Sequence, residues 1–303
     1  MQENKKELVI NWHITEVCNY DCQYCFAKWD EHAPREEVCR DTASSRTLLG
    51  ELSAFFSPDN PDNPLHSSLQ WGNIRLNIAG GEPMLHDKHF YRVIEQAAEL
   101  GMKASIITNG SYLTPESVPK IAPHLSWLGI SIDSSLSTSN RIIGRNDAKG
   151  LQLDLEKMPD LLGLARSINP ELRIKINTVV NSENHKEDFQ PLIEALSPDK
   201  WKIFKVLPII NRHLQIHDGE YEAFVLRHSA FSQIMYPENN EEMRESYIMI
   251  DPKGRFFQNS EANLPDNYRY SQPIHEAGAK QAFSQIRFSL RKFDSRYRTT
   301  QAS

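Results

Sequence analysis

Residues 8–25 read LVINWHITEVCNYDCQYC, and this stretch decides the fold. Its first part, residues 8–14, is an apolar run of the length that is typical of a buried strand. Three cysteines, Cys18, Cys22 and Cys25, follow that run directly. A strand that leads straight into a loop of metal-binding residue types predicts a βα unit whose functional groups lie at the C-terminal end of the strand.

Similar β-rich runs recur along the chain, and helical stretches separate them. The expected strands are residues 8–14, 74–78, 103–108, 127–132, 172–180 and 201–207. The expected helices are residues 45–56, 88–100, 116–121, 151–167 and 186–196. Strands that alternate with helices build a parallel sheet covered by those helices. We therefore expect an α/β protein whose units form a partial (β/α)6 barrel.

The alternation fades beyond about residue 211. Turn-like residues 251–254 lie between two short β-rich runs and predict a hairpin. A further helix is expected near residues 274–283. We therefore expect two parts, a barrel of residues 1–210 and a C-terminal extension of residues 211–303 that packs on the barrel and closes the substrate pocket.

The composition argues against several classes of protein. The chain of 303 residues carries a formal net charge of −6, whereas nucleic-acid-binding proteins are usually basic. It has no apolar run long enough for a membrane span, and residues 1–7 lack the apolar core of a signal peptide. Four cysteines in a chain of this length do not form a disulfide framework. We expect a cytoplasmic monomer that binds neither nucleic acid nor a membrane.

The cysteine spacing indicates an iron–sulfur cluster. Three thiolates on one short loop can bind three irons of a [4Fe–4S] cluster, which leaves the fourth iron free to bind a substrate. Cys39 is distant in sequence and is left out of this set. The alternatives are three unrelated cysteines or a zinc site that lacks a ligand. Zinc usually takes four protein ligands in structural sites, commonly from two Cys-x2-Cys pairs, and the chain has no second pair.

The Cys-x3-Cys-x2-Cys motif, with an aromatic residue before its last cysteine, resembles the signature of the radical S-adenosylmethionine (SAM) superfamily. In that superfamily the open iron binds SAM, and an electron from the cluster cleaves SAM to give a 5′-deoxyadenosyl radical. The resemblance implies SAM contacts at successive strand ends, although each segment alone would also suit an ordinary turn. The implied SAM-binding residues are Tyr24, Gly80, Gly81, Glu82, Asn109, Ser131 and Asp133.

Polar residues also occur on strands that should be buried. Because side chains alternate along a strand, the polar ones share one face, which we expect to point into the barrel. Several desolvated cations need a compensating anion, and no matching set of carboxylates is evident on the strands. A triphosphate fits such a set, and Arg145 could add a guanidinium. The alternative is a set of edge positions or outward-reaching lysines. The strand residues are Arg75, Asn77, Lys175, Asn177, Lys200 and Lys202.

Several segments, in order from about residue 10 to residue 258, together resemble the viperin family of radical SAM enzymes. They are NIAGGEP at 77–83, TNGS at 108–111, IGR at 143–145, KINTVV at 175–180, WKIF at 201–204 and SYIMID at 246–251. The resemblance implies that the strand residues above and Arg145 hold a nucleoside triphosphate, and that Tyr247 is catalytic near the ribose. Arg75 stands where the animal enzyme has lysine, and Ala79 replaces a serine.

The implied reaction converts CTP, UTP or GTP to its 3′-deoxy-3′,4′-didehydro form. Hydrogen leaves C4′, the 3′-hydroxyl leaves as water, and an electron donor such as flavodoxin or ferredoxin supplies the electron. An antiviral role follows by analogy with the family. The rival interpretations are a radical SAM peptide maturase, an activating enzyme and a non-enzymatic iron–sulfur sensor. The sequence does not identify the base.

Overall fold

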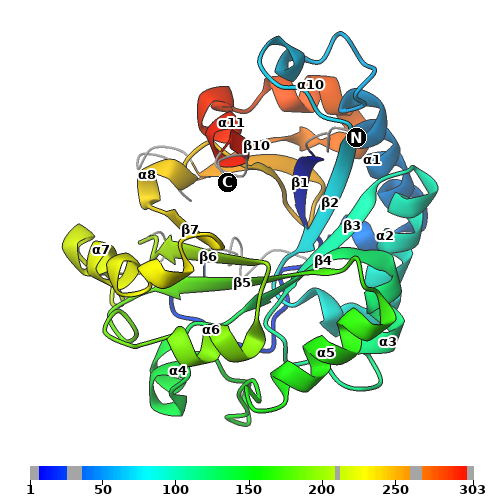
Figure 1. Cartoon of the computed structure of the whole chain (residues 1–303). Helices are drawn as coiled ribbons and strands as arrows, with labels where there is room; N and C mark the ends of the chain where they lie inside the picture. The colour runs from blue at the N-terminus through cyan, green and yellow to red at the C-terminus, as the bar shows by residue number, and fades with distance from the viewer. Residues whose placement is uncertain (1–6, 26–35, 209–211, 260–267, 299–303) are drawn as a thin grey trace. The chain divides into compact units, whose positions relative to one another are not determined.

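The computed structural model describes residues 7–25, 36–208, 212–259 and 268–298 (Figure 1). The strands are β1 (Glu7–His13), β2 (Asn73–Ala79), β3 (Lys103–Thr108), β4 (Leu125–Ser131), β5 (Arg173–Val180), β6 (Lys200–Lys205), β7 (Met235–Glu238), β8 (Ile248–Ile250), β9 (Arg255–Asn259) and β10 (Tyr268–Pro273). The helices are α1 (Thr42–Phe55), α2 (Asp87–Glu99), α3 (Val118–Ile121), α4 (Ser137–Ile143), α5 (Met158–Ile168), α6 (Gln190–Leu196), α7 (Asp218–Arg227), α8 (Asn240–Met243), α9 (Ile274–Ala277), α10 (Ala279–Ser284) and α11 (Leu290–Arg298).

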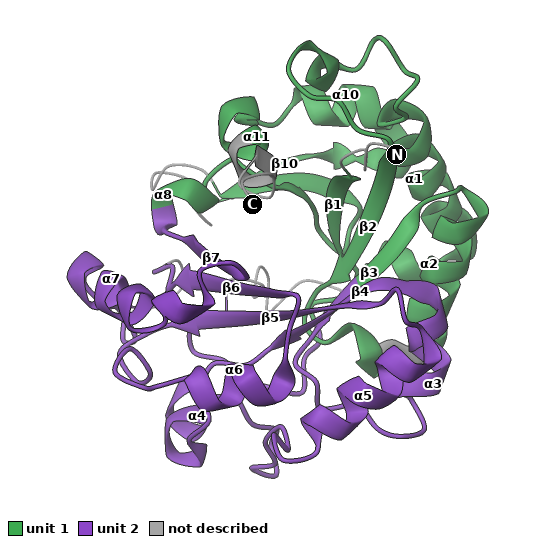
Figure 2. Cartoon of the chain, viewed as in Figure 1, with its two compact units in different colours: residues 1–16, 30–105, 241–303 green, residues 17–29, 106–240 purple. Residues whose placement is uncertain are grey.

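The chain divides into two compact units (Figure 2). The first unit comprises Met1–Glu16, Asp30–Ser105 and Glu241–Ser303, and the second comprises Val17–Trp29 and Ile106–Asn240. The C-terminal residues 241–303 thus pack with the N-terminal strands in one unit. Each unit combines segments that are far apart in the sequence, and the boundary expected at residue 210 remains a prediction.

In the first unit the strand order is β10-β9-β8-β1-β2, and the N-terminal half of β3 follows β2. β1 runs parallel to β2 and to β8, whereas β9 is antiparallel to β8 and β10. The alternating apolar residues of β1, Leu8, Ile10 and Trp12, are buried, because helices cover that face. Figure 1 shows α1 and α2 side by side beside these strands.

In the second unit the C-terminal half of β3 is followed by β4-β5-β6-β7, all parallel. Ile174 and Ile176 of β5 and Trp201 of β6 are fully buried on the face that α5 and α6 cover (Figure 1). His228 completes this core: its Nε2 accepts a hydrogen bond from the Phe189 backbone N–H at 2.9 Å. Burial lowers the pKa of His228, which keeps the ring neutral and suited to that acceptor role.

The predicted α/β architecture of a partial barrel is confirmed. The strands β1 to β6 follow the predicted order with bounds within two residues of those expected, and the hairpin β8–β9 is present. The strand order ends at β10 and β7, and these two are not paired with each other in the described part of the chain.

Several elements were not predicted. The alternation continues for one more unit, α7 and β7, beyond the point where it was expected to fade. The short helix α4 follows β4, and β10 extends the C-terminal hairpin to three strands. In the described chain, none of the helices combines the length and the apolar character needed to cross a membrane.

Candidate functional site

The cysteine loop lies in the second unit and is fixed by its backbone. The N–H of Asp21 donates to the carbonyl of Gly144 at 3.2 Å, and the N–H of Gln23 donates to the carbonyl of Ile143 at 2.9 Å. Gly144 has a φ of +86°, and a Cβ there would lie 2.1 Å from the carbonyl oxygen of Asp21. A side chain cannot be accommodated at this position, so the glycine that ends α4 allows the close approach of the cysteine loop.

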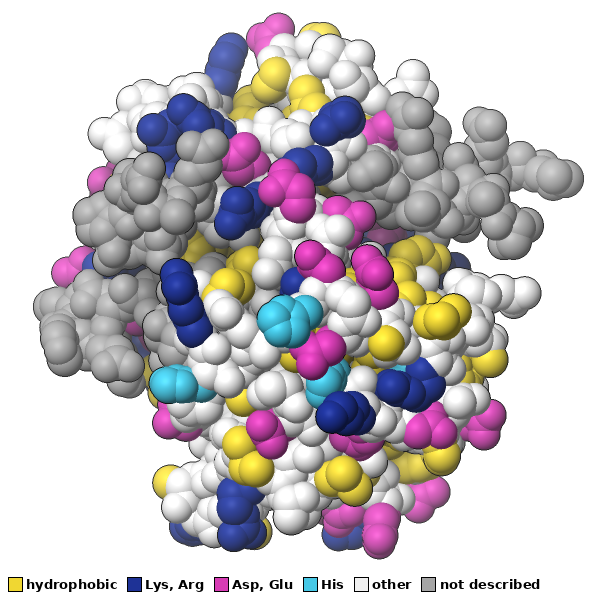
Figure 3. Space-filling model, turned by 90° about the vertical axis from the view of Figure 1, so that its left-hand side faces the viewer, with side chains coloured by type: hydrophobic (Ala, Val, Ile, Leu, Met, Phe, Trp, Pro, Cys, Tyr) yellow, Lys and Arg dark blue, Asp and Glu magenta, His cyan; other side chains and the backbone are white. Residues whose placement is uncertain are grey.

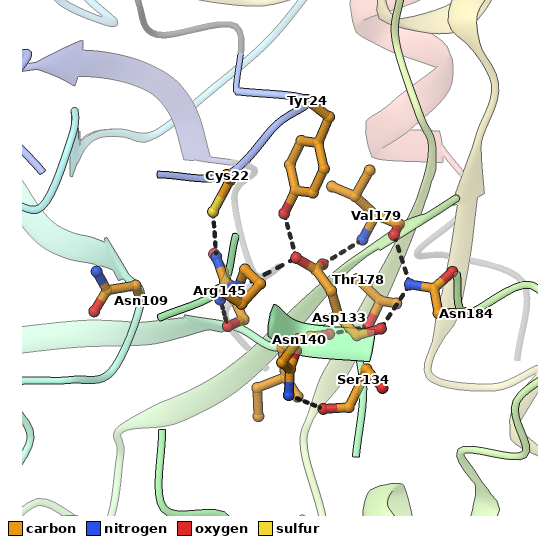
Figure 4. Close-up of polar contacts among 12 residues, drawn as sticks. Cys22, Tyr24, Asn109, Asp133, Ser134, Asn140, Arg145, Thr178, Val179 and Asn184 are labelled. Carbon is orange, nitrogen blue, oxygen red and sulfur yellow. Dashed lines mark hydrogen bonds and ion pairs between the residues drawn. The ribbon is translucent and has the colours of Figure 1, made fainter. Parts of the chain in front are cut away.

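Hydrogen-bond donors surround the thiols of this loop. Cys18 Sγ accepts from the backbone N–H of Tyr20 at 3.4 Å and from Asn109 Nδ2 at 3.8 Å. Cys22 Sγ accepts from Arg145 Nη1 at 3.7 Å (Figure 4). Donors and a nearby cation favour the thiolate, which is the form that binds a metal.

This donor set fits an iron–sulfur cluster better than a single metal ion. Cys18, Cys22 and Cys25 are half-buried. Nowhere in the described ranges do three His, Cys, Asp or Glu side chains lie close enough together to hold one ion. A cubane needs its three thiolates at three separate irons, so thiols spread along one loop suit it.

Asp133 connects the cysteine loop to the end of β4 (Figure 4). The hydroxyl of Tyr24 donates to Asp133 Oδ2, and Arg145 Nε lies 3.3 Å from the same oxygen. Asp133 Oδ1 accepts from the backbone N–H of Val179 at 2.8 Å, so the carboxylate is held from β5 as well. Arg145 also donates to the carbonyl of Ser131. One buried carboxylate therefore positions both the aromatic residue of the cysteine loop and the guanidinium.

The pKa values of Tyr24 and Arg145 in this group are both raised. Burial is the largest effect on Tyr24 and, with the adjacent Asp133 carboxylate, raises its pKa well above the usual value. Burial alone would lower the pKa of Arg145, but Asp133, Tyr24 and Cys22 raise it well above its usual value. Arg145 is therefore a permanent cation beside Cys22, and Tyr24 remains a hydrogen-bond donor over the whole physiological range of pH.

Asn109, at the end of β3, contacts the cysteine loop. Its Nδ2 donates to Asn19 Oδ1 at 2.9 Å, and its Oδ1 accepts from the backbone N–H of Ser111 at 2.9 Å. Asn19 Nδ2 in turn donates to Ser111 Oγ at 3.0 Å. Asn19 and Ser111 were not predicted as site residues, although Asn19 lies between two of the cysteines. The structure thus brings the predicted Tyr24, Asn109, Ser131 and Asp133 together around the thiols.

The predicted glycines Gly80 and Gly81 lie in the first unit, against the end of β1. The N–H of Gly81 donates to the carbonyl of Thr15 at 2.7 Å. A Cβ on Gly80, whose φ is +147°, would lie 2.5 Å from the same oxygen. Glu82 is fully buried, and its carboxylate accepts from the N–H of Met84 at 3.1 Å. This turn requires glycine for its close packing on Thr15.

The predicted polar residues of β5 and β6 form two rows across the second unit. Lys175 and Lys200 are neighbours in register, and Lys175 adjoins Gly129 of β4. A Cβ on Gly129 would lie 2.9 Å from Lys175 Cε, so the glycine leaves room for the lysine side chain. In the second row Asn177 lies between Ser131 and Lys202.

Asn177 adds to the second row a buried carbonyl oxygen that can accept a hydrogen bond from a ligand. It is 7% exposed, and no hydrogen bond from the described residues reaches its Oδ1. A buried acceptor without a donor is costly, which indicates that a ligand or water supplies one. This atom lies in the row of residues that the sequence assigned to the nucleotide.

The prediction that no carboxylates accompany the strand cations is wrong. Arg75 Nε lies 2.8 Å from Glu7 Oε2, and Lys202 Nζ forms an ion pair with Glu238. Glu7 was assigned to no strand, and Glu238 lies on β7, which was not predicted. Register between strands, which pairs these charges, is not visible in the sequence.

In the first unit a series of side-chain hydrogen bonds links the predicted Arg75 and Asn77. Arg75 Nη1 donates to Ser105 Oγ at 2.9 Å, and Ser105 Oγ donates to Asn77 Oδ1 at 2.8 Å. Asn77 Nδ2 then donates to Asn11 Oδ1 at 2.8 Å. Asn11 and Ser105 were missed, although Asn11 is the polar residue within the apolar run of β1.

Two predicted residues lie apart from the strand rows. Arg145, assigned to the nucleotide from the sequence, makes its contacts with the cysteine loop, Ser131 and Asp133. Tyr247 is half-buried in the first unit, just before β8, and its carbonyl accepts from Gln258 Nε2 at 2.6 Å.

Comparison with known proteins gives concordant matches. A sequence family described as Radical SAM superfamily matches residues 12–150. The chain is 43% identical over 293 residues to the S-adenosylmethionine-dependent nucleotide dehydratase of Psychrobacter lutiphocae, covering 97% of this chain and 95% of the relative. It is 38% identical over 294 residues to the enzyme of the same name from Pseudoalteromonas ulvae, covering 97% and 94%.

Solved structures add a likeness of fold. SuiB of Streptococcus suis, solved with S-adenosylmethionine bound, superposes with a TM-score of 0.63 at 14% identity. The match covers 95% of this chain and 67% of that chain. At this identity the likeness concerns the fold alone, and it confirms the radical SAM architecture.

Proposed function

The chain belongs to the viperin-like family of S-adenosylmethionine-dependent nucleotide dehydratases, and from this premise we propose that it dehydrates the ribose of a nucleoside triphosphate. The product is the 3′-deoxy-3′,4′-didehydro nucleotide: hydrogen leaves C4′, and the 3′-hydroxyl leaves as water. The family's [4Fe–4S] cluster and SAM supply the radical that takes the hydrogen. The names of the relatives favour this activity over a peptide maturase, an activating enzyme or a sensor.

The observation that carries the proposal is the row Ser131–Asn177–Lys202 on three neighbouring strands of one unit. Ser131 belongs to the group around the cysteine loop, because its carbonyl accepts from Arg145. Neighbouring strands lie about 4.8 Å apart, so the backbone of Lys202 lies about 10 Å from that of Ser131. A cofactor bound at one end of the row and a phosphate chain bound at the other would therefore be separated by no more than the length of one nucleotide.

The residues around the thiols would hold the cofactors. Cys18, Cys22 and Cys25 carry the cluster, and Arg145 offers a permanent positive charge to a carboxylate such as that of SAM. This role fits the contacts of Arg145 better than the triphosphate role expected from the sequence. The assignment of Gly80 and Gly81 to the SAM amino group remains a prediction from the resemblance.

The strand residues would hold the substrate. Lys175, Lys200 and Lys202 supply three ammonium groups on two neighbouring strands, and Asn177 offers its unused carbonyl to a hydroxyl or amino group. The assignment of Arg75 and Asn77 to the same triphosphate, and of Tyr247 to catalysis, remains a prediction from the resemblance.

The remaining features of the proposal concern partners. A one-electron donor such as flavodoxin or ferredoxin would reduce the enzyme, which would act as a cytoplasmic monomer. On the face shown in Figure 3, basic side chains are interspersed with acidic ones, and no uniformly basic patch forms there. This pattern supports a small nucleotide over a nucleic acid as the substrate, since nucleic-acid surfaces are basic stripes or patches.

Anaerobic incubation of the reconstituted enzyme with SAM, a reductant and CTP, UTP or GTP singly tests the proposal. We expect one of them to raise the yield of 5′-deoxyadenosine well above the background and to give a nucleotide lighter by one water in mass spectrometry. Absence of stimulation by every nucleoside triphosphate would contradict the proposed function.

A further inference from the structure

The strand β7 places two side chains over the lysines of β6. Tyr236 and Glu238 share one face of β7, because side chains alternate along a strand. Lys200 Nζ lies 3.7 Å from the centre of the Tyr236 ring, and Lys202 Nζ is ion-paired with Glu238. Both lysines of β6 that are assigned to the triphosphate, Lys200 and Lys202, therefore already contact side chains of the protein itself.

The Lys200–Tyr236 and Lys202–Glu238 contacts would respond differently to the binding of a phosphate. The Tyr236 ring carries no charge, so it can stay beside Lys200 when a phosphate binds. Glu238 is an anion, and its side chain is 8% exposed, while that of Lys202 is 15% exposed. With so little solvent to screen them, a carboxylate and a phosphate beside one ammonium repel each other.

We propose that Glu238 is an internal counter-ion that occupies Lys202 until the phosphate chain of the nucleotide displaces it. This inference rests on the proposed function, since it takes Lys202 as a phosphate ligand. The carboxylate lowers the affinity for every ligand that needs Lys202, because the ion pair must first be broken. It also compensates the buried ammonium while no nucleotide is bound.

The same strand of the protein offers a matched control. Lys205 of β6 also forms an ion pair with a carboxylate, Asp218, at 2.6 Å. Lys205 has the opposite parity to Lys202 and therefore points to the other side of the sheet. The side chain of Asp218 is 83% exposed, so Asp218→Asn removes a lysine–carboxylate pair of the same strand without touching the proposed phosphate site.

The test is isothermal titration with inorganic tripolyphosphate at fixed ionic strength, with the wild type, Glu238→Gln and Asp218→Asn. We expect Glu238→Gln to lower the Kd about tenfold, since it removes a like charge from the site, and Asp218→Asn to leave it unchanged. Equal or weaker binding by Glu238→Gln would overturn the inference, because Glu238 would then orient Lys202 or play no part. If neither protein bound tripolyphosphate, the phosphate site of the proposed function would fail as well.

Thermal unfolding provides a second readout for a variant that folds poorly. Without ligand, Glu238→Gln leaves the ammonium of Lys202 buried without this carboxylate, so we expect a lower Tm than in the wild type. Tripolyphosphate should then raise the Tm of the variant more than that of the wild type. An equal rise in both proteins would contradict the counter-ion role.

Discussion

The group around the cysteine loop and the row of strand lysines hold their charges in different ways. Arg145 is fixed by a carboxylate, a backbone carbonyl and a thiol, and the loop itself is fixed by backbone hydrogen bonds. Lys200 contacts the ring of Tyr236 of β7, and Lys202 forms an ion pair with Glu238 of the same strand. The proposed cofactor site is therefore held by backbone and side-chain contacts together, whereas the proposed substrate site includes side-chain contacts that a ligand can replace.

The largest effect should come from breaking the fixed region at Gly144. In Gly144→Ala the new Cβ would collide with Asp21 O, so we expect the cysteine loop to move and cluster incorporation to be lost. Absorbance of the reconstituted protein measures this. Gly150→Ala is the matched control: its φ is +80°, but nothing lies within 4 Å of the added Cβ. It should cost only about 1 kcal/mol for the left-handed backbone and should keep the cluster. A normal cluster in Gly144→Ala would show that the loop is not fixed there.

A smaller loss is expected at Asp133, which is 1% exposed. Asp133→Asn removes the carboxylate that faces Arg145, and breaking a buried ion pair on one side costs about 3–5 kcal/mol. Denaturant unfolding measures this loss. The exposed pair of Lys157 and Asp154 is the contrast, since Asp154→Asn should leave the stability unchanged. Equal effects of the two variants would remove the distinction between the fixed site and the surface.

The smallest effect should appear at Glu7, whose pairing with Arg75 belongs to the strand cations. Burial raises the pKa of Glu7, but Arg75 and Lys103 outweigh burial and lower it below its usual value of 4.5. The pair therefore stabilises the fold above about pH 4.5, and this contribution is lost as the pH falls through the lowered pKa. Glu7→Gln should cost about 1 kcal/mol at pH 7 and nothing at low pH. A cost that is independent of pH would contradict an ionic contribution.

The regular part of the fold could be predicted from the sequence, because its strands are apolar runs bounded by turns. The bounds of β3, for example, agree with the prediction at both ends. β7 could not be found in this way, since its four residues include a proline and a glutamate and show no apolar alternation. α4 is also short, with seven residues, and Gly144 marks its end.

The two regions of the site were predictable to different extents. The residues of the cysteine loop are close together in the sequence, so one motif predicted both Tyr24 and the three thiols. The partners of the strand cations, Glu7 and Glu238, come from neighbouring strands, and their pairing depends on a register that only the folded sheet sets. The contacts of Arg145 with Cys22, Ser131 and Asp133 were not predictable either, because a loop residue can turn to either side of its strand.

Lys202→Ala tests the central claim most directly, because it separates the two regions in one protein. We expect the variant to keep the absorbance of the reconstituted cluster and the background cleavage of SAM, and to lose the stimulation of 5′-deoxyadenosine formation by the preferred nucleoside triphosphate. The row Ser131–Asn177–Lys202 would then join a cofactor site to a separate phosphate site. Full stimulation in Lys202→Ala, or loss of the cluster with it, would contradict the account.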